Sequence, residues 1–297
     1  MKKLITLLLA VAMVFMVCAC GQTAAPAATD EPDAEATADP NAGEPVAEFT
    51  TVTPGKLTVA TSPDFAPYEF YAIDEAGNPV LSGFDVALAQ YIADYLNLEL
   101  EIIPMDFDGV LAELANGTVD IGLAGLSPDP KRMDAMDFSD IYYMGGQSFV
   151  TTVANKDLFT SLEDANKAEY SIGAQTASIQ YNLALEHTPD ADVVMLTKVT
   201  DIIAELLGGK LDGAFIETAV AECYAINYPD LSIVLDVPYD TAGSAVGISK
   251  GNEALVAAVN EAVAAAVADG SLDQFVTDAN ELAAGSVYEG LLEDYDS

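Results

Sequence analysis

Basic side chains are scarce in this sequence of 297 residues. Lysine and arginine together number 10, against 48 aspartates and glutamates, so the formal net charge is -38 at pH 7. Nucleic-acid binding depends on clustered cations that contact phosphates, and this balance therefore argues against nucleic acid as a partner. The same negative charge favours a soluble monomer whose folded part does not adhere to anionic membrane surfaces.

Histidine, cysteine and tryptophan are also rare. There is one histidine, His187, there are three cysteines, and there is no tryptophan. A zinc site, or a Ser-His or Cys-His catalytic pair, needs more of these side chains than the chain offers. We therefore expect no metal, no cofactor and no histidine-dependent hydrolase activity.

The first residues carry the pattern of an export signal. Two lysines precede an apolar run over 4–17, which is shorter than a stable membrane span. The sequence Val17-Cys18-Ala19-Cys20-Gly21 follows and resembles a bacterial lipobox, which implies cleavage before Cys20 and lipidation of its thiol. The alternative is an ordinary cleaved signal that contains cysteines. We assign 1–19 to a signal peptide and expect the mature chain to be lipid-anchored on the extracytoplasmic face of the cell membrane.

The segment that follows the anchor differs from the rest of the chain. Residues 20–54 are rich in Ala, Pro, Thr, Asp and Glu and lack apolar periodicity. Such a segment buries too little surface to offset its ordering entropy, and we expect a disordered tether. Beyond it the mature chain holds one further cysteine, Cys223, which excludes an intramolecular disulfide and suits a small core residue.

Strand and helix signals alternate from Lys56 onward. Residues 57–60, 98–103 and 119–123 are typical of strands, and apolar residues recur at helical spacing over 88–96. Later, Ser161-Leu162-Glu163-Asp164 resembles a capped helix start, and an Ala- and Val-rich helix is predicted over 253–269. This alternation predicts an α/β fold with largely parallel sheets.

The chain resembles the extracytoplasmic solute-binding proteins of amino-acid ABC importers, of the family 3 type and in lipoprotein form. Each matching stretch is weak alone, but together they follow in the same order and spacing. The stretches are 56–68, Gly83-Phe84-Asp85-Val86, Asp106-Phe107-Asp108, 124–132, 137–143 and Gly173-Ala174-Gln175-Thr176.

The resemblance, which extends from residue 56 to about residue 280, implies a type II periplasmic-binding-protein fold. In that fold two α/β lobes are joined by two hinge crossovers, and the ligand binds in the cleft between them. The implied first lobe comprises 55–149 plus 243–297, and the second comprises 150–242. The crossovers are then expected near Phe149 and near Ala245-Val246-Gly247.

The same resemblance implies the ligand contacts of the first lobe. Arg132 stands at the position of the carboxylate-binding arginine, Ser127 at that of a hydroxyl donor, and Gly125 at that of a main-chain contact. A guanidinium suits this task because it is planar, permanently charged and able to donate two parallel hydrogen bonds. The alternative for Arg132 is an exposed side chain on a solvated turn beside Asp129 and Asp134.

In the second lobe the match to the family is less complete. Ser178 is the candidate donor at a helix start whose amides favour an anion, but Ile179 replaces the second hydroxyl often found there. Glu217 stands where the family typically has an aspartate for the ligand's ammonium group. Its alternative role is a helix-start acid that interacts with the helix dipole.

Aromatic residues are expected to frame the ligand's side chain. Phe65, Tyr68 and Phe107 match family positions around the pocket, although each also suits a core. We interpret Asp85 as a structural helix cap. Few unpaired acids stand at the matched positions, which argues weakly against a strongly basic ligand.

These observations predict a receptor that binds an amino acid or similar small carboxylate and delivers it to an ABC transporter permease. An alternative is a cyclohexadienyl or arogenate dehydratase-like enzyme on the same fold, with Glu217 or Asp64 as the general acid. The scarcity of histidine and the tether argue against it, and we expect no enzyme activity. A ligand-sensing domain ranks last, because no transmembrane segment is expected after residue 20.

Overall fold

The computed structural model describes residues 49–240 and 243–285. These residues all belong to the unit Pro45–Ser297. The predicted signal peptide, the lipidation site Cys20 and most of the predicted tether lie outside the described residues, as does the acidic end of the chain.

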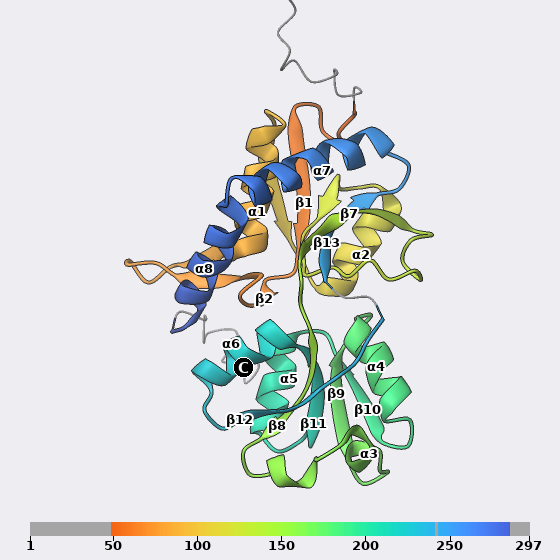
Figure 1. Ribbon diagram of the computed structural model, residues 1–297. Coiled ribbons are helices and arrows are strands. Elements are labelled where there is room, and N and C mark those ends of the chain that lie inside the picture. The colour runs from red at the N-terminus through yellow and green to blue at the C-terminus, as the bar shows by residue number, and fades with distance from the viewer. Residues whose placement is uncertain (1–48, 241–242, 286–297) are drawn as a thin grey trace, which may run out of the picture. The chain divides into compact units, whose positions relative to one another are not determined.

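The first lobe is built on a sheet of five strands in the order β5-β1-β6-β13-β7 (Figure 1). β1 is parallel to its neighbours β5 and β6, whereas β13 is antiparallel to β6 and β7. The strands are β1 (Lys56–Thr61), β5 (Glu99–Pro104), β6 (Ile121–Gly122), β7 (Met136–Tyr143) and β13 (Ser244–Ser249).

Four helices and a small three-stranded sheet complete the first lobe. The apolar faces of these helices are buried against the five-stranded sheet or against one another, which is the usual way that an α/β layer forms a core. The elements are β2 (Asp64–Phe65), β3 (Glu69–Ile73), β4 (Pro79–Ser82), α1 (Phe84–Tyr95), α2 (Phe107–Asn116), α7 (Glu253–Ala268) and α8 (Ser271–Ala283).

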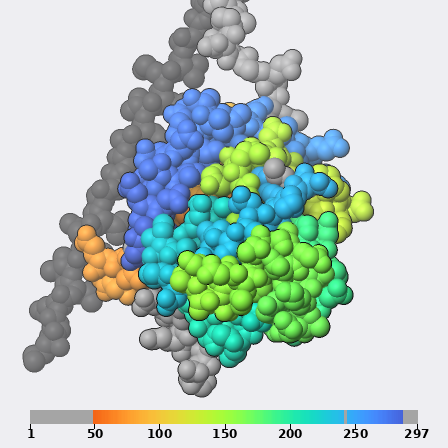
Figure 2. Space-filling model, turned by 60° about the horizontal axis from the view of Figure 1, so that its bottom comes forward, coloured from red at the N-terminus to blue at the C-terminus, as the bar shows by residue number. Residues whose placement is uncertain are grey.

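The second lobe repeats this plan with a sheet in the order β10-β9-β11-β8-β12 (Figure 1). Figure 2 shows its green and cyan segments on the same face as the blue helices of the C-terminal part of the first lobe. The strands are β8 (Gln147–Thr152), β9 (Ser171–Gln175), β10 (Asp192–Leu196), β11 (Gly213–Glu217) and β12 (Leu231–Asp236). The helices are η1 (Lys156–Leu158), α3 (Leu162–Ala165), α4 (Ile179–His187), α5 (Val199–Leu207) and α6 (Thr218–Asn227).

The chain changes sheet twice, slightly earlier than expected in each case. β7 belongs to the first sheet and β8 to the second, so the first change falls at 144–146, before Phe149. The second change falls between β12 and β13, because Ala245 and Gly247 already pair with strands of the first sheet. Two glycines mark the first crossover. A Cβ on Gly145 would lie 2.5 Å from Glu217 Oε1, and a Cβ on Gly146 would lie 2.7 Å from Thr218 Oγ1.

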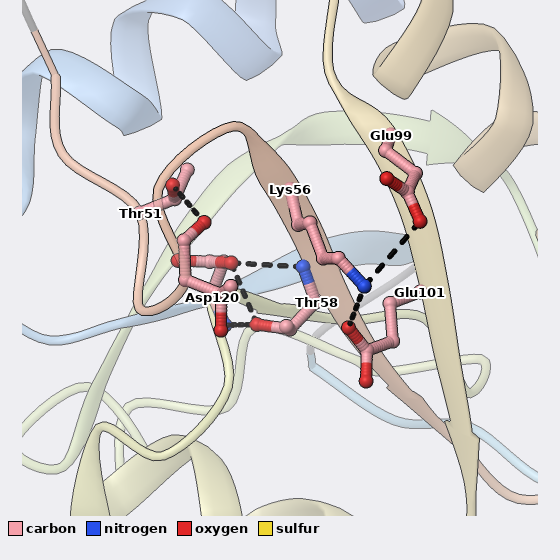
Figure 3. Close-up of polar contacts among 7 residues, drawn as sticks. Thr51, Lys56, Thr58, Glu99, Glu101 and Asp120 are labelled. Carbon is pink, nitrogen blue, oxygen red and sulfur yellow. Dashed lines mark hydrogen bonds and ion pairs between the residues drawn. The ribbon is translucent and has the colours of Figure 1, made fainter. Parts of the chain in front are cut away.

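A buried aspartate, Asp120, directly precedes β6 and links it to β1, the neighbouring inner strand of the first sheet (Figure 3). Its carboxylate accepts hydrogen bonds from the Thr58 amide (2.8 Å), the Thr58 hydroxyl (2.6 Å) and the Val52 amide (2.7 Å). Nearby, the Lys56 ammonium lies 3.3 Å from Glu99 and 3.0 Å from Glu101. The two bonds from Thr58 are buried and join β1 to the chain before β6. Partly exposed ion pairs such as those of Lys56 contribute little to stability.

Two predicted helices are confirmed in detail. Ser161 and Asp164 form the predicted capping box at α3, each side chain bonding the other's backbone. α7 ends one residue before the predicted end at 269. None of the helices within the described ranges is by itself long and apolar enough to cross a membrane, and α7 with α8 meets that test only as a pair bent by 75°.

Candidate ligand-binding site

Arg132 lies in the turn that follows β6 and points into the protein. Its guanidinium donates to the main-chain oxygen of Ser127 at 3.2 Å and to that of Ala177, in the second lobe, at 3.2 Å. The guanidinium also lies over the Phe107 ring, 5.5 Å from its centroid. Burial lowers the pKa of Arg132 to about 10, which leaves it charged at neutral pH. The alternative of an exposed arginine on a solvated turn is therefore wrong, since the side chain is half-buried.

One cavity collects most of the predicted contacts of the first lobe. Its volume is about 10 Å³, which is the room needed by one water molecule. A ligand of amino-acid size therefore requires the two walls to separate, as expected of a hinged cleft. The lining residues are Phe65, Phe107, Ala124, Gly125, Ser127, Arg132, Gln175, Ile179 and Gln180.

Gly125 has a backbone conformation and surroundings that require glycine. Its φ is +54°, and a Cβ at this position would lie 2.6 Å from the Phe65 ring. Its amide donates to Asp85 Oδ2 at 3.0 Å. Because the amide is engaged, a main-chain contact from Gly125 to a ligand would use the carbonyl oxygen.

Asp85 is not the helix cap predicted from the sequence. The N-cap of α1 is Gly83, and no side chain makes a capping bond there. Asp85 is 0% exposed, and its carboxylate accepts from the Gly125 amide and from the Tyr142 hydroxyl at 2.6 Å. The residue thus supports the cavity wall rather than the helix end.

In the second lobe, Ser178 is the N-cap of α4. Its hydroxyl accepts from the Tyr181 amide at 3.1 Å and donates to the Gln175 carbonyl at 2.7 Å. Contact with a ligand through this hydroxyl would therefore require the Gln175 bond to be exchanged. Ile179, the departure from the family pattern, lines the cavity directly.

Glu217 is the N-cap of α6 and is only 4% exposed. Its carboxylate accepts from the Val220 amide at 2.9 Å and from the Gly146 amide, in the first crossover, at 3.3 Å. Burial raises the pKa of Glu217 to about 7. Glu217 therefore caps α6 and also lies beside the first crossover.

The three predicted aromatics divide into two groups. Phe65 and Phe107 line the cavity. Tyr68 is fully buried behind it, with ring centroids 5.3 Å from Phe65 and 4.3 Å from Phe84. A Cβ on Gly145 would lie 3.0 Å from the Tyr68 hydroxyl and 2.5 Å from Glu217 Oε1. The Tyr68 hydroxyl and the Glu217 carboxylate therefore border the same point of the first crossover.

Several residues of the site were not predicted as ligand contacts. Gln175 and Gln180 are buried polar side chains that line the cavity. Asp64, considered only as a general acid, accepts from Gln175 Nε2 at 3.2 Å and from the Val199 amide at 2.5 Å, both in the second lobe. Burial raises the pKa of Asp64 to about 6. Gln175 stands in a matched stretch, but nothing in the sequence pairs it with a residue 111 positions away.

The described residues contain no group of three or more His, Cys, Asp and Glu side chains suited to a metal ion. Cys223 is a buried core residue, and burial raises the pKa of its thiol to about 12. His187 stacks on Phe215 with the ring centroids 6.3 Å apart. Neither residue lines the cavity.

Residues 57–278 match the model of the bacterial extracellular solute-binding proteins, family 3. The chain belongs to this family. The prediction of a type II two-lobed binding protein that acts outside the cytoplasm in amino-acid import is confirmed.

Two of the relatives of this solute-binding protein are described by the amino acid that they bind. The arginine-binding extracellular protein ArtP of Bacillus subtilis is 31% identical over 258 residues, covering 85% of this chain and 88% of the relative. A crystal structure of an amino acid ABC transporter substrate-binding protein, AbpA from Streptococcus pneumoniae, bound to L-arginine has a TM-score of 0.74. It is 33% identical and covers 77% of this chain and 96% of that one.

The chain is also similar to an enzyme of the alternative class. The cyclohexadienyl dehydratase of Pseudomonas aeruginosa is 25% identical over 192 residues, covering 64% of this chain and 70% of the enzyme. The more similar relatives and structures named above are binding proteins. The chain is accordingly a binding protein rather than an enzyme.

Proposed function

We propose that this protein is a lipid-anchored, monomeric receptor for an L-amino acid, with arginine as the leading ligand, and that it delivers the ligand to the permease of an ABC importer. The observation that carries the proposal is Arg132. It is a half-buried arginine that lines the interlobe cavity and reaches main-chain oxygens of both lobes.

The ligand's carboxylate is assigned to Arg132 and Ser127. An incoming carboxylate can replace the carbonyl of Ala177 as an acceptor for the guanidinium, and the Ser127 hydroxyl borders the same cavity. Charge-assisted bonds of a guanidinium to a carboxylate are stronger than its bonds to carbonyls, so the exchange is favourable.

The ligand's ammonium is assigned to Glu217 and to the carbonyl of Gly125. A buried carboxyl group with a pKa of about 7 is costly to ionise, and an adjacent cation offsets that cost. In this proposal Ser178 contributes through the start of α4, whose amides favour the carboxylate.

The ligand's side chain is assigned to the space between Phe65 and Phe107. One relative is named as an arginine-binding protein, and a related crystal structure is bound to L-arginine. A guanidinium can stack on aromatic faces, as Arg132 already does on Phe107. Asp64 adds negative potential next to Gln175. This proposal departs from the expectation that a strongly basic ligand is not favoured.

The anchor rests on the sequence Val17-Cys18-Ala19-Cys20-Gly21. If Cys20 carries lipid, metabolic labelling with an alkyne-tagged fatty acid will mark the wild-type chain and will not mark Cys20→Ala. Equal labelling of both chains would reject the anchor without affecting the ligand proposal.

A thermal-shift screen tests the ligand proposal. Protein freed of carried-over ligand by unfolding and refolding is screened against the common amino acids, because a ligand that binds only the folded state raises the unfolding midpoint. We expect arginine to give the largest shift. No shift with any amino acid would reject the proposal, and turnover of prephenate or arogenate in the same samples would favour the dehydratase alternative.

A further inference from the structure

A pair of buried acids lies directly behind the cavity wall. Glu69 is the first residue of β3, Asp85 is the second residue of α1, and both are 0% exposed. The close approach of the two elements is built in by Gly83, where a Cβ would lie 2.1 Å from the Tyr68 main-chain oxygen. The Asp85 amide also donates to that oxygen at 2.9 Å.

The surroundings of the two carboxyl groups are unequal. Asp85 accepts hydrogen bonds from the Gly125 amide and the Tyr142 hydroxyl and lies in the first turn of a helix, where a negative charge is favoured. Neither oxygen of Glu69 has a hydrogen-bond donor among the described residues. Two adjacent buried carboxyl groups cannot both be ionised, so the proton belongs on Glu69.

The electrostatics agree with this assignment. Burial and the negative charges of Asp85 and Asp64 raise the pKa of Glu69 well above its usual range. Burial raises the pKa of Asp85 as well, but only to about 6, because Gly125, Tyr142 and Glu69 bond to its ionised form. With the proton on Glu69, its carboxyl hydroxyl is the donor and the ionised Asp85 the acceptor within the pair.

We propose that Asp85 is a positioning residue of the ligand site, held in its ionised form by protonated Glu69, and that its bond to the Gly125 amide fixes the segment from Gly125 to Ser127. This inference rests on the proposed function, since it assigns a role in binding to residues that do not touch the ligand.

Two hydrogen bonds to other elements hold the first two residues of the segment from Gly125 to Ser127. Asp85 holds the Gly125 amide, and the Leu126 carbonyl accepts from the Ala245 amide of β13 at 2.8 Å. Between these bonds the left-handed Gly125 brings the chain against the Phe65 ring. Loss of the Asp85 bond frees the first end, so Ser127 and the Phe65 face lose their fixed separation.

Asp120 provides a matched control. It is also an aspartate of the first lobe, 3% exposed, and its carboxylate likewise accepts main-chain and hydroxyl hydrogen bonds. None of its partners lines the cavity. Asp120→Asn therefore removes a comparable buried charge without reaching the segment from Gly125 to Ser127.

The experiment compares Asp85→Asn, Glu69→Gln and Asp120→Asn by calorimetric titration with L-arginine at pH 7.5. We expect Asp85→Asn to weaken binding about 10- to 100-fold, as the loss of a hydrogen bond to a charged group implies. Glu69→Gln, whose neutral amide still donates to Asp85, should bind within about 3-fold of wild type, since the hydrogen bond is retained. Asp120→Asn should lower the unfolding midpoint and leave the affinity unchanged. Wild-type affinity in Asp85→Asn, or an equal loss in Asp120→Asn, would overturn the proposal.

Amide hydrogen exchange separates this inference from the proposed function. In Asp85→Asn the Gly125 amide should exchange faster while the Thr58 amide keeps its protection, even if arginine does not bind. If Asp85→Asn does not fold, the wild-type chain still decides the matter, because the Gly125 amide resonance should titrate with a midpoint near 6. A Gly125 resonance that is insensitive to pH, or unchanged Gly125 exchange in the variant, would contradict the positioning role.

Discussion

The two lobes supply candidate ligand contacts of different kinds. In the first lobe, Arg132 and Ser127 lie on the loops between β6 and β7, outside any helix. In the second lobe, Ser178 and Glu217 are the N-caps of α4 and α6. The first set can be altered with little effect on secondary structure, whereas the second set links ligand binding to helix stability. Mutations should therefore separate binding from folding in one lobe and combine them in the other.

Arg132→Ala is expected to have the largest effect on binding. Truncating one partner of a buried charge pair should weaken a carboxylate ligand at least about 100-fold, to the point where calorimetry detects no binding. The neighbouring exposed cation provides the control, since Lys131→Ala removes the same charge and should bind normally. Unchanged affinity in Arg132→Ala would reject the assignment of the ligand's carboxylate to Arg132.

Glu217→Gln tests the second lobe. We expect about a 30-fold loss of affinity for an α-amino acid, because an ammonium then loses its buried counter-charge. A ligand that lacks the ammonium, such as 5-guanidinopentanoate for arginine, should bind wild type and variant equally. Equal losses for the two ligands would assign Glu217 to the α6 cap alone.

The pH dependence of binding should report the same residue. An ammonium next to Glu217 favours the ionised form, so binding lowers a pKa that is about 7 without ligand and releases a proton. Affinity should therefore fall as the pH decreases below about 7 and level off above it. Calorimetry in buffers of different ionisation enthalpy measures this release, which should vanish in Glu217→Gln and persist in Asp120→Asn.

The stability of the free protein should depend on pH in the opposite sense. Asp64, Asp85 and Glu217 have pKa values raised to about 6, 6 and 7, so their folded forms bind protons more tightly than the unfolded chain. Their contribution to stability is complete below about pH 4 and is lost as the pH rises through 6 to 7. The unfolding midpoint of ligand-free protein should accordingly rise between pH 7.5 and pH 5. A falling midpoint would contradict these assignments.

Ser178→Ala should show the smallest effect on binding and a clear effect on stability. Loss of a serine N-cap costs about 1 kcal/mol of unfolding free energy. Ser127→Ala, without a capping role, should instead weaken binding about 5- to 10-fold with little change in the unfolding midpoint. Chemical denaturation and titration of both variants provide the comparison, and the reverse pattern would exchange the assigned roles.

Much of the fold could be predicted from local patterns. The α3 capping box and the extent of α7 depend on neighbouring residues; the capping box is confirmed, and α7 matches its prediction to within one residue. The crossovers were displaced by a few residues, because a strand's side chains do not reveal which sheet it joins. Nothing in the sequence around Phe149 indicates whether that strand joins the sheet of the first lobe or that of the second.

The candidate site was predictable only where one residue carries the chemistry. Arg132 stands out because the chain has no other arginine. The role of Asp85 was predicted wrongly, since its partner Gly125 lies 40 positions away and only the folded chain brings them together. In the same way, the sequence suggested a cap or a ligand contact for Glu217, and the structure places a capping residue next to the crossover.

A ligand-by-mutant cycle tests the central claim most directly. The amino acid found in the screen and its decarboxylated amine, in the first instance L-arginine and agmatine, are titrated into wild type and Arg132→Gln. If Arg132 holds the carboxylate, the substitution should weaken L-arginine at least about 100-fold and leave the weaker binding of agmatine unchanged. An equal loss for both ligands, or no loss for L-arginine, would contradict the account.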